Sequence, residues 1–298
     1  MIRIGSRGSK LALWQANFVA DALRTRGESV EILIIRTTGD QLQETALPTP
    51  GKGLFTTEIE NALRRNEVDV AVHSLKDLPT EIAPEFCLAA IPQRADARDV
   101  LLAREKVSIA TLAPSAHVAT SSPRRRGQLL YLRHDLQVEP IRGNVDTRIR
   151  RLMEGDVDAI VLAAAGVERL KLTSFVQEYL APEIMCPAPG QGALAVQCRE
   201  DDSATRAAVC FLDDAETRFC VEVERNILAR LGGGCSVPVG VHCAPETHGH
   251  RVWAAVCSAD GTSMVRIEHS GREDSEDLAL KISERLRREG AEAILAAK

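Results

Sequence analysis

The chain has 298 residues, of which 45% are hydrophobic and 27% charged, and its formal net charge is −5. This is the composition of a soluble globular protein, and the length predicts two or three domains. The acidic balance argues against a general nucleic-acid binder, and the longest apolar run, residues 159–167, is too short to span a bilayer.

Eight cysteines are scattered along the chain without a CxxC pair, at positions 87, 186, 198, 210, 220, 235, 243 and 257. This spacing argues against a zinc site or a disulfide framework, so no metal is expected. The first five residues read directly as a strand, without a signal-peptide pattern. We therefore expect a cytoplasmic protein in which most cysteines are small core residues.

The first part of the chain alternates between strand and helix patterns. Strands are expected at residues 2–5, 30–36 and 68–73, and helices at 9–26 and 55–65, with a long polar loop over 38–53. Alternation of this kind predicts a parallel sheet built from βαβ units.

After residue 92 the same pattern begins again. Strands are expected at 100–103, 118–121, 136–140 and 159–163, and helices at 123–133 and 145–154. A Pro- and Gly-rich stretch, residues 186–192, reads as a hinge, and an apolar strand at 193–198 is expected to return to the first domain.

The last part reads as a small α+β domain. A helix at 215–231 precedes strands at 237–243, 251–257 and 264–269, and a helix at 275–288 follows them. The expected division is 1–92 with 193–212 as domain 1, 98–187 as domain 2 and 215–298 as domain 3.

The segment His73–Pro79 is the first candidate for chemistry, because it follows a buried strand and so lies where open α/β sheets place their ligands. Lys76 can hold an anion, while Asp77 can meet a cation or pass a proton. The alternative is a structural turn in which Asp77 caps Pro79 and Thr80.

Hydroxyl and basic side chains collect in a second segment, Thr120–Arg126. Thr120, Ser121 and Ser122 precede a helix N-terminus, which favours anions. Arg124 and Arg125 oppose the helix dipole there, so an anion is expected to offset them.

Arginines recur farther along, since Arg142–Asn144 and Arg148 again flank a strand end and a helix start. The chain has 30 Arg against 7 Lys, and the planar guanidinium of Arg grips carboxylate or phosphate through two hydrogen bonds. Codon bias could explain the total number of arginines but not their clustering in these segments. A solvated basic face is the alternative for Arg126, Arg150 and Arg151.

Two further basic segments, Ser6–Lys10 and Gly51–Gly53, complete the pattern, and the second lacks the spacing of a Walker A loop. Together these segments predict a cleft between two α/β lobes for a ligand with several carboxylates or phosphates. A two-lobed protein that binds a polyanionic metabolite without chemistry is the competing hypothesis.

A glycine-rich loop, residues 231–240, presents Cys235 after three consecutive glycines. Glycine lets the backbone turn sharply and approach a ligand closely. Read alone, the loop is compatible with a small buried thiol or with a point of covalent attachment.

Taken together, these motifs resemble the porphobilinogen deaminase family, also called hydroxymethylbilane synthases. The resemblance runs from end to end through Arg7 with Leu11–Ala16, Gly51–Phe55, His73–Pro79, Thr120–Arg125, Arg142–Val145, Pro189–Gly192 and Gly233–Pro238. It implies two α/β domains like those of type II periplasmic binding proteins, plus a small α+β C-terminal domain.

The resemblance also implies an activity. The family is a transferase of porphyrin (tetrapyrrole and heme) biosynthesis that joins four porphobilinogen molecules head to tail, releasing ammonia each time, to give hydroxymethylbilane. Its cofactor is dipyrromethane, bound through a thioether to the position of Cys235. Asp77 matches the catalytic Asp, and either charge stabilisation or proton transfer is open for it.

The growing chain carries acetate and propionate groups, and the resemblance implies a set of residues that bind them. This set is Arg7, Ser9, Lys52, Ser74, Lys76, Thr120, Ser121, Ser122, Arg124, Arg125, Arg142, Asn144, Arg148 and Gln191. Porphobilinogen is the expected partner, with no nucleic acid or membrane, and the family suggests a monomer. The chain departs from relatives at Thr56–Thr57, where some carry a Lys, and at Asp146, which is expected to cap a helix.

Overall fold

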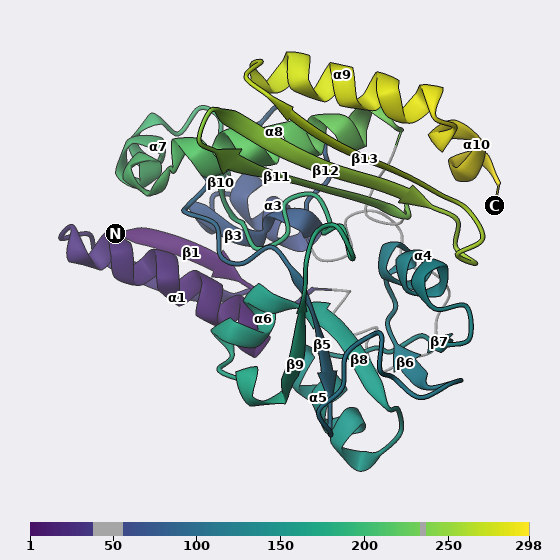
Figure 1. The fold of residues 1–298 in the computed structure, drawn as a ribbon. Coiled ribbons are helices and arrows are strands. Elements are labelled where there is room, and N and C mark those ends of the chain that lie inside the picture. The colour runs from purple at the N-terminus through teal and green to yellow at the C-terminus, as the bar shows by residue number, and fades with distance from the viewer. Residues whose placement is uncertain (38–55, 233–236, 298) are drawn as a thin grey trace. The chain divides into compact units, whose positions relative to one another are not determined.

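A computed structural model of the chain describes residues 1–37, 56–232 and 237–297 (Figure 1). These residues divide into two compact units. The first consists of Met1–Ala95 with Ala193–Arg218, and the second of Asp96–Gly192 with the residues from Phe219 onward.

The first unit is built on a five-stranded sheet with the order β2-β1-β3-β10-β4. Strands β1 (Ile2–Ser6), β2 (Val30–Ile34) and β3 (Val70–Ser74) are parallel. Strand β10 (Leu194–Arg199) lies between β3 and β4 (Phe86–Ala90) and is antiparallel to both. The sheet is therefore mixed, not parallel as expected, because its fourth strand enters from a distant part of the chain.

Helices cover both faces of this sheet. Helix α1 (Lys10–Thr25) begins where the Ser9 hydroxyl accepts the Ala12 N–H at 3.3 Å, and it packs one apolar stripe on the sheet. Helix α7 (Ser203–Val209) and the 3₁₀ turn Cys210–Leu212 add to that face, while α3 (Thr57–Arg64) covers the other.

The second unit contains a sheet of the same plan, with the order β7-β6-β8-β5-β9. Strands β6 (His117–Ala119), β7 (Gln137–Glu139) and β8 (Ala159–Ala163) are parallel, and β5 (Asp99–Ala103) is antiparallel to both β8 and β9 (Val176–Leu180). Helix α4 (Pro123–Leu132) covers one face, while α5 (Val145–Glu154) and α6 (Ala164–Arg169) cover the other.

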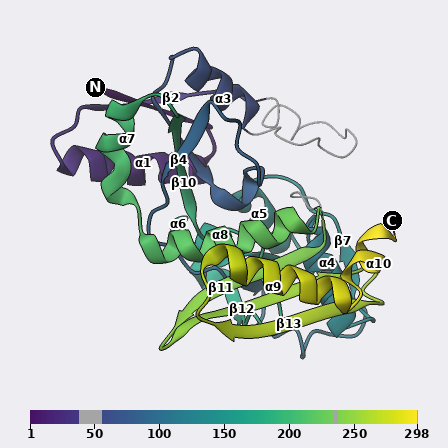
Figure 2. The same cartoon turned by 90° about the horizontal axis from the view of Figure 1, so that it is seen from above.

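A three-stranded antiparallel sheet completes the second unit. It consists of β11 (Val239–Glu246), β12 (Gly249–Cys257) and β13 (Met264–Gly271). Residues of α8 (Ala215–Arg230), α9 (Ser275–Arg288) and α10 (Ala291–Ala296) pack on one face of it (Figure 2). The expected α/β and α+β architecture is confirmed: two α/β sheets of one plan and a small α+β part.

The other face of the three-stranded sheet packs closely against α4 and against the segment at Cys186. A Cβ added at Gly127 of α4 would lie 2.5 Å from the Ser258 carbonyl oxygen, and one at Gly240 would lie 2.5 Å from that of Cys186. Only glycine permits such an approach between backbones. The expected division into three domains stays a prediction, because these two parts form one compact unit here.

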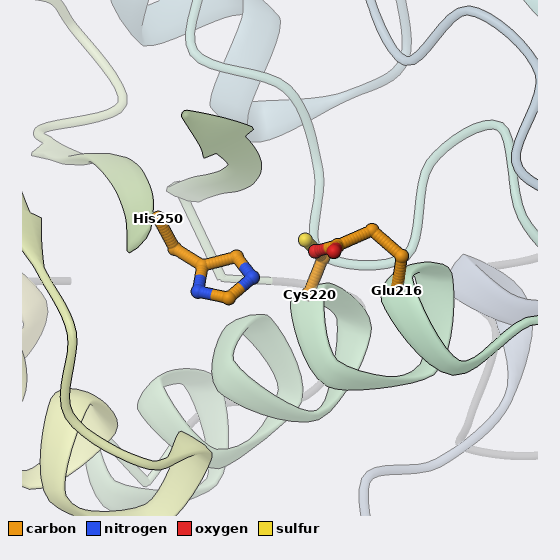
Figure 3. Close-up of side chains that lie close together, drawn as sticks. All are labelled: Glu216, Cys220 and His250. Carbon is orange, nitrogen blue, oxygen red and sulfur yellow. The ribbon is translucent and has the colours of Figure 1, made fainter. Parts of the chain in front are cut away.

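Of the seven cysteines in the described ranges, five are buried, as expected for small core residues: Cys186, Cys198, Cys220, Cys243 and Cys257. Cys220 of α8 lies beside His250 of β12, with Glu216 one turn earlier on the same helix (Figure 3). The His250 ring stacks on Phe219 at a centroid distance of 3.9 Å.

No helix within the described ranges combines the length and the apolar character that crossing a bilayer requires.

A buried polar chain joins three elements of the first unit. His73 of β3 is 2.9 Å from the Gln197 side-chain oxygen of β10, and the Gln197 amide nitrogen donates to Glu60 of α3 at 3.1 Å. Since the Gln197 oxygen can only accept, Nε2 of His73 carries the proton. Burial lowers the pKa of His73 to about 4, and Arg7 contributes to the shift, although Gln197 opposes it.

His73 should therefore make the free energy of unfolding depend on pH. An unfolded histidine titrates near pH 6.5, so between that pH and about 4 the unfolded chain binds a proton that the folded chain excludes. Stability should fall as the pH drops through this window, by at most about 1.4 kcal/mol per pH unit.

Urea unfolding between pH 4 and 7 measures this effect. We expect a shallower decline for His73→Gln, and the wild-type slope for His134→Gln, which removes an exposed histidine. Equal slopes for wild type and His73→Gln would contradict the assignment.

Candidate functional site

In the first unit, candidate residues follow two neighbouring parallel strands. Arg7 and Ser9 come directly after β1, while Ser74 ends β3, so both groups lie at the same edge of the sheet. The Gln15 amide of α1 donates to the Ser74 hydroxyl at 2.8 Å and ties the two segments together. Ser9 has a structural task as well, because its hydroxyl caps α1.

Lys76 and Asp77 lie on a short 3₁₀ turn, Leu75–Asp77, that follows β3 directly. Leu75 is fully buried and its N–H donates to the Ala193 carbonyl oxygen at 3.1 Å, which anchors the turn on the start of β10. The Asp77 side chain is exposed. The turn thus presents a carboxylate to solvent from a fixed backbone.

In the second unit, the candidate loops follow β6 and β7, which are again parallel neighbours. The Ser121 hydroxyl donates to the Ile141 carbonyl oxygen at 2.6 Å and accepts the Ile141 N–H at 3.0 Å, so it clamps the two loops together. Ser122 caps α4, and the Thr120 hydroxyl accepts the Ser122 N–H at 3.2 Å. These hydroxyls therefore shape the loops.

Arg124 and Arg125, in the first turn of α4, are both buried and share one counterion, Asp99 of β5. Arg124 donates to one carboxylate oxygen of Asp99 at 2.7 Å, and Arg125 donates to the other at 2.8 and 3.0 Å. Asp99 is fully buried. Burial by itself would raise the pKa of Asp99, but the two guanidinium groups hold it well below its usual range.

Asp99 is thus an anion that offsets the two arginines, and we had not singled it out from the sequence. Its position, at the end of the polar segment 96–99 and directly before an apolar strand, is the one available signal. Gln191 also belongs to this group, because its amide donates to Asp99 at 2.8 Å and to the Ala97 carbonyl oxygen at 2.7 Å.

Gln191 lies in the Pro- and Gly-rich stretch that precedes β10, and a second buried carboxylate holds that stretch. Glu224 of α8 accepts the Gly190 N–H at 2.6 Å and the Cys243 N–H at 2.8 Å. A carboxylate that accepts backbone N–H groups in a buried site fixes the position of the segments that donate to it. Gly190 and Gln191 are thereby held from two sides.

The remaining candidates of this unit lie at the start of α5. Arg142 and Asn144 are exposed, and Arg148 donates from Nε to the Gly143 carbonyl oxygen at 2.8 Å. The capping position of α5 is Asn144, so the expected cap role of Asp146 is wrong. Asp146 lies inside the first turn, where the helix dipole stabilises a negative charge.

Two candidates, Lys52 and Cys235, lie outside the described residues. The assignment of the other candidates to ligand binding stays a prediction. The structure places Arg7, Ser9, Ser74, Lys76 and Asp77 in one unit, and the other described candidates in the second.

Solved structures with a similar fold include a periplasmic substrate-binding protein of an ABC transporter from Coxiella burnetii. It is 16% identical, with a TM-score of 0.44, over 71% of this chain and 91% of that one. The methionine binding protein MetQ is 12% identical, with a TM-score of 0.44, over 71% of this chain and 89% of its own. These likenesses are weak.

The sequence comparisons are far stronger. Residues 2–207 match the family profile described as "Porphobilinogen deaminase, dipyromethane cofactor binding domain", and residues 218–288 match "Porphobilinogen deaminase, C-terminal domain". The porphobilinogen deaminase of Chloroherpeton thalassium is 43% identical over 98% of this chain and 96% of its own length. The porphobilinogen deaminase of Geobacter sulfurreducens is 44% identical over 99% of this chain and 94% of its own length. The chain belongs to the porphobilinogen deaminase family.

Proposed function

We propose that this chain is a transferase that joins four porphobilinogen molecules into hydroxymethylbilane, with release of ammonia, on a dipyrromethane bound to Cys235. The family match over both parts of the chain supports this activity. The observation that carries the proposal beyond the family name is the gathering of basic and hydroxyl side chains after parallel strands in both units.

The described donor set fits a ligand that carries several carboxylates. Nε of Arg124 is buried, and no group in the described part of the chain accepts a hydrogen bond from it. A buried donor without an acceptor costs about 1–3 kcal/mol, which a carboxylate of a ligand would remove. Arg142 and Asn144 add donors that are open to solvent.

The dipyrromethane supplies the pyrrole end to which porphobilinogen units are added. Asp77 then acts on the reacting pyrroles: its carboxylate stabilises the positive charge that develops as ammonia leaves, or accepts the proton released after carbon–carbon bond formation. The buried Leu75 anchors the 3₁₀ turn and fixes its backbone, so little reorganisation is needed. Lys76 precedes Asp77 in the sequence, and Arg7 and Ser74 lie at the same edge of the sheet. These three side chains bind the carboxylates of the substrate and of the growing chain.

The arginines of α4 have a different task from Arg142. Asp99 orients Arg124 and Arg125 and offsets one of their two positive charges, so we propose that they present a preformed set of donors at the start of the helix. Arg142 is exposed and is proposed to contact ligand directly. Gln191 supports the set through Asp99.

The same proposal includes a monomer that works in the cytoplasm, without nucleic acid or membrane as a partner. The net charge of −5 supports the absence of nucleic acid. The seven cysteines in the described ranges are free thiols, which fits a reducing compartment.

Intact-mass spectrometry tests the covalent cofactor and separates this function from non-covalent binding of a polyanion. We expect the purified protein to exceed its sequence mass by one dipyrromethane and to gain discrete pyrrole units with porphobilinogen. Cys235→Ser should show the bare sequence mass. If the wild-type protein keeps the bare sequence mass after incubation with porphobilinogen, the proposed covalent cofactor on Cys235 is contradicted.

Asp77→Asn should keep the fold and the added cofactor mass but lose about 10²- to 10³-fold in kcat, because one charge-stabilising group is lost. Steady-state formation of hydroxymethylbilane measures this. Glu81→Gln, which neutralises an exposed carboxylate nearby, should keep the wild-type rate. Near-normal turnover by Asp77→Asn would exclude Asp77 from the chemistry.

Arg142→Leu and Asp99→Asn should fail in different ways. Arg142 is exposed, so its loss should impair cofactor loading or elongation while the free energy of unfolding changes by less than about 0.5 kcal/mol. Asp99→Asn leaves two buried guanidinium groups without a counterion and should destabilise the protein by about 3–5 kcal/mol.

Urea unfolding and pyrrole addition, measured on both variants, distinguish these outcomes. Arg150→Leu, an exposed position on α5, is the control and should change neither quantity. Unchanged kinetics of Arg142→Leu would show that Arg142 does not contact the ligand and belongs to the solvated surface.

A further inference from the structure

Two thiols of the first unit face each other across neighbouring strands. Cys87 of β4 and Cys198 of β10 are directly paired in the antiparallel ladder, and their sulfur atoms are 3.6 Å apart. Directly opposed residues in such a ladder have Cα atoms about 4.5–5.5 Å apart, which lies within the range that a disulfide spans. The backbone is therefore already placed for a bond between the two sulfurs.

Access to the two thiols differs. Cys198 is fully buried, whereas Cys87 is partly exposed on β4, the edge strand of the sheet. Cys87 also lines a cavity of about 530 Å³, a volume typical of small-molecule sites. The rest of its lining is Leu88, Ala89, Arg206, Ala207, Cys210 and Arg218.

The two arginines of the cavity already have counterions. Arg206 donates to the Glu200 carboxylate at 3.0 Å, and Arg218 donates to Asp213 at 2.6 Å. The cavity thus offers two thiols, Cys87 and Cys210, between neutralised ion pairs. A small neutral or zwitterionic molecule with a sulfur that reacts with thiols is the class of ligand that this lining accommodates.

We propose that Cys87 is a site of S-thiolation by small disulfides that enter this cavity, and that Cys198 resolves the product into a Cys87–Cys198 disulfide. In the first step the Cys87 sulfur bonds to one sulfur of RSSR, whose S–S bond breaks, and one RSH leaves. In the second, the Cys198 sulfur attacks the Cys87 sulfur and releases the other RSH. The two cysteines lose two electrons and two protons, and the small disulfide gains them.

The surroundings of Cys87 make this reaction slow at neutral pH. Burial raises the pKa of the Cys87 thiol, and Glu200 adds to the shift, while contact with Cys198 and the charge of Arg206 oppose it. Burial and the neighbouring Cys87 raise the pKa of Cys198 to about 12. Because only the thiolate attacks, the rate of thiolation should rise about tenfold per pH unit from pH 7 to 9.

Bis(2-hydroxyethyl) disulfide, a small neutral disulfide, tests the proposal on the purified full-length protein. After incubation at pH 8.5, free thiols are blocked with N-ethylmaleimide and the protein is digested without reduction for peptide mapping. We expect a linked pair of peptides that contain Cys87 and Cys198. In Cys198→Ala the reaction should stop with one 2-mercaptoethanol in disulfide linkage on Cys87, and in Cys87→Ala Cys198 should stay unmodified.

Cys210→Ala is the matched control, because it removes the other thiol of the cavity from an exposed position, and it should still form the disulfide. If a core variant fails to fold, wild type and Cys210→Ala decide the outcome. Three results overturn the proposal: an unmodified Cys87 in wild type, a link from Cys87 to Cys210, or a rate that does not change between pH 7 and 9.

Discussion

The buried carboxylate of Asp99 between Arg124 and Arg125 is the interaction on which the second unit depends. Three ionised groups that are nearly or fully excluded from water require mutual compensation, and here each guanidinium has its own carboxylate oxygen. The cluster joins β5 to the start of α4, so it fixes the end of the helix at which ligand carboxylates are proposed to bind. A small shift of Asp99 would move both arginines together.

Buried hydrogen bonds extend this interaction to distant parts of the chain. Gln191 donates to Asp99, and the preceding Gly190 donates to Glu224 of α8, which also holds the backbone of β11 through Cys243. Glycines 127 and 240 allow the backbones of the two parts to approach where any side chain would collide. The described residues on either side of positions 233–236 therefore lie in a part of the fold that is tightly joined to the arginine cluster.

Much of this fold could be predicted from the sequence because most core strands and long helices carry clear apolar periodicity. The strands that escaped prediction, β4 and β9, each lie at one edge of a large sheet, whereas the opposite edges, β2 and β7, were predicted. Both strands are only five residues long and most of their side chains are half-buried, so they are easily overlooked in the sequence. The mixed direction of both sheets also escaped, because strand direction depends on pairing between distant segments.

The candidate site likewise has features that could be predicted from the sequence and features that could not. The loops that contain Asp77, Ser121 and Arg142 could be located because each follows a predicted strand. The need for an anion beside Arg124 and Arg125 was also predictable, but its source was not, since nothing in the sequence pairs residue 99 with residues 124 and 125. Ser9, Ser121 and Ser122 were assigned to ligand binding from their positions near helix starts and from the family resemblance, and their hydrogen bonds show that they also shape the loops.

The insertion of β10 between β3 and β4 also determines the order in which the chain can fold during synthesis. All strands of the second large sheet lie between residues 99 and 180, so that sheet can close once residue 180 has left the ribosome. The first sheet must wait for residues 194–199, although its other strands are synthesised much earlier. Until then β3 and β4 both have an unpaired edge, and such edges are sites of aggregation. The N-terminal unit is thus the first to be made and the later of the two large sheets to be completed.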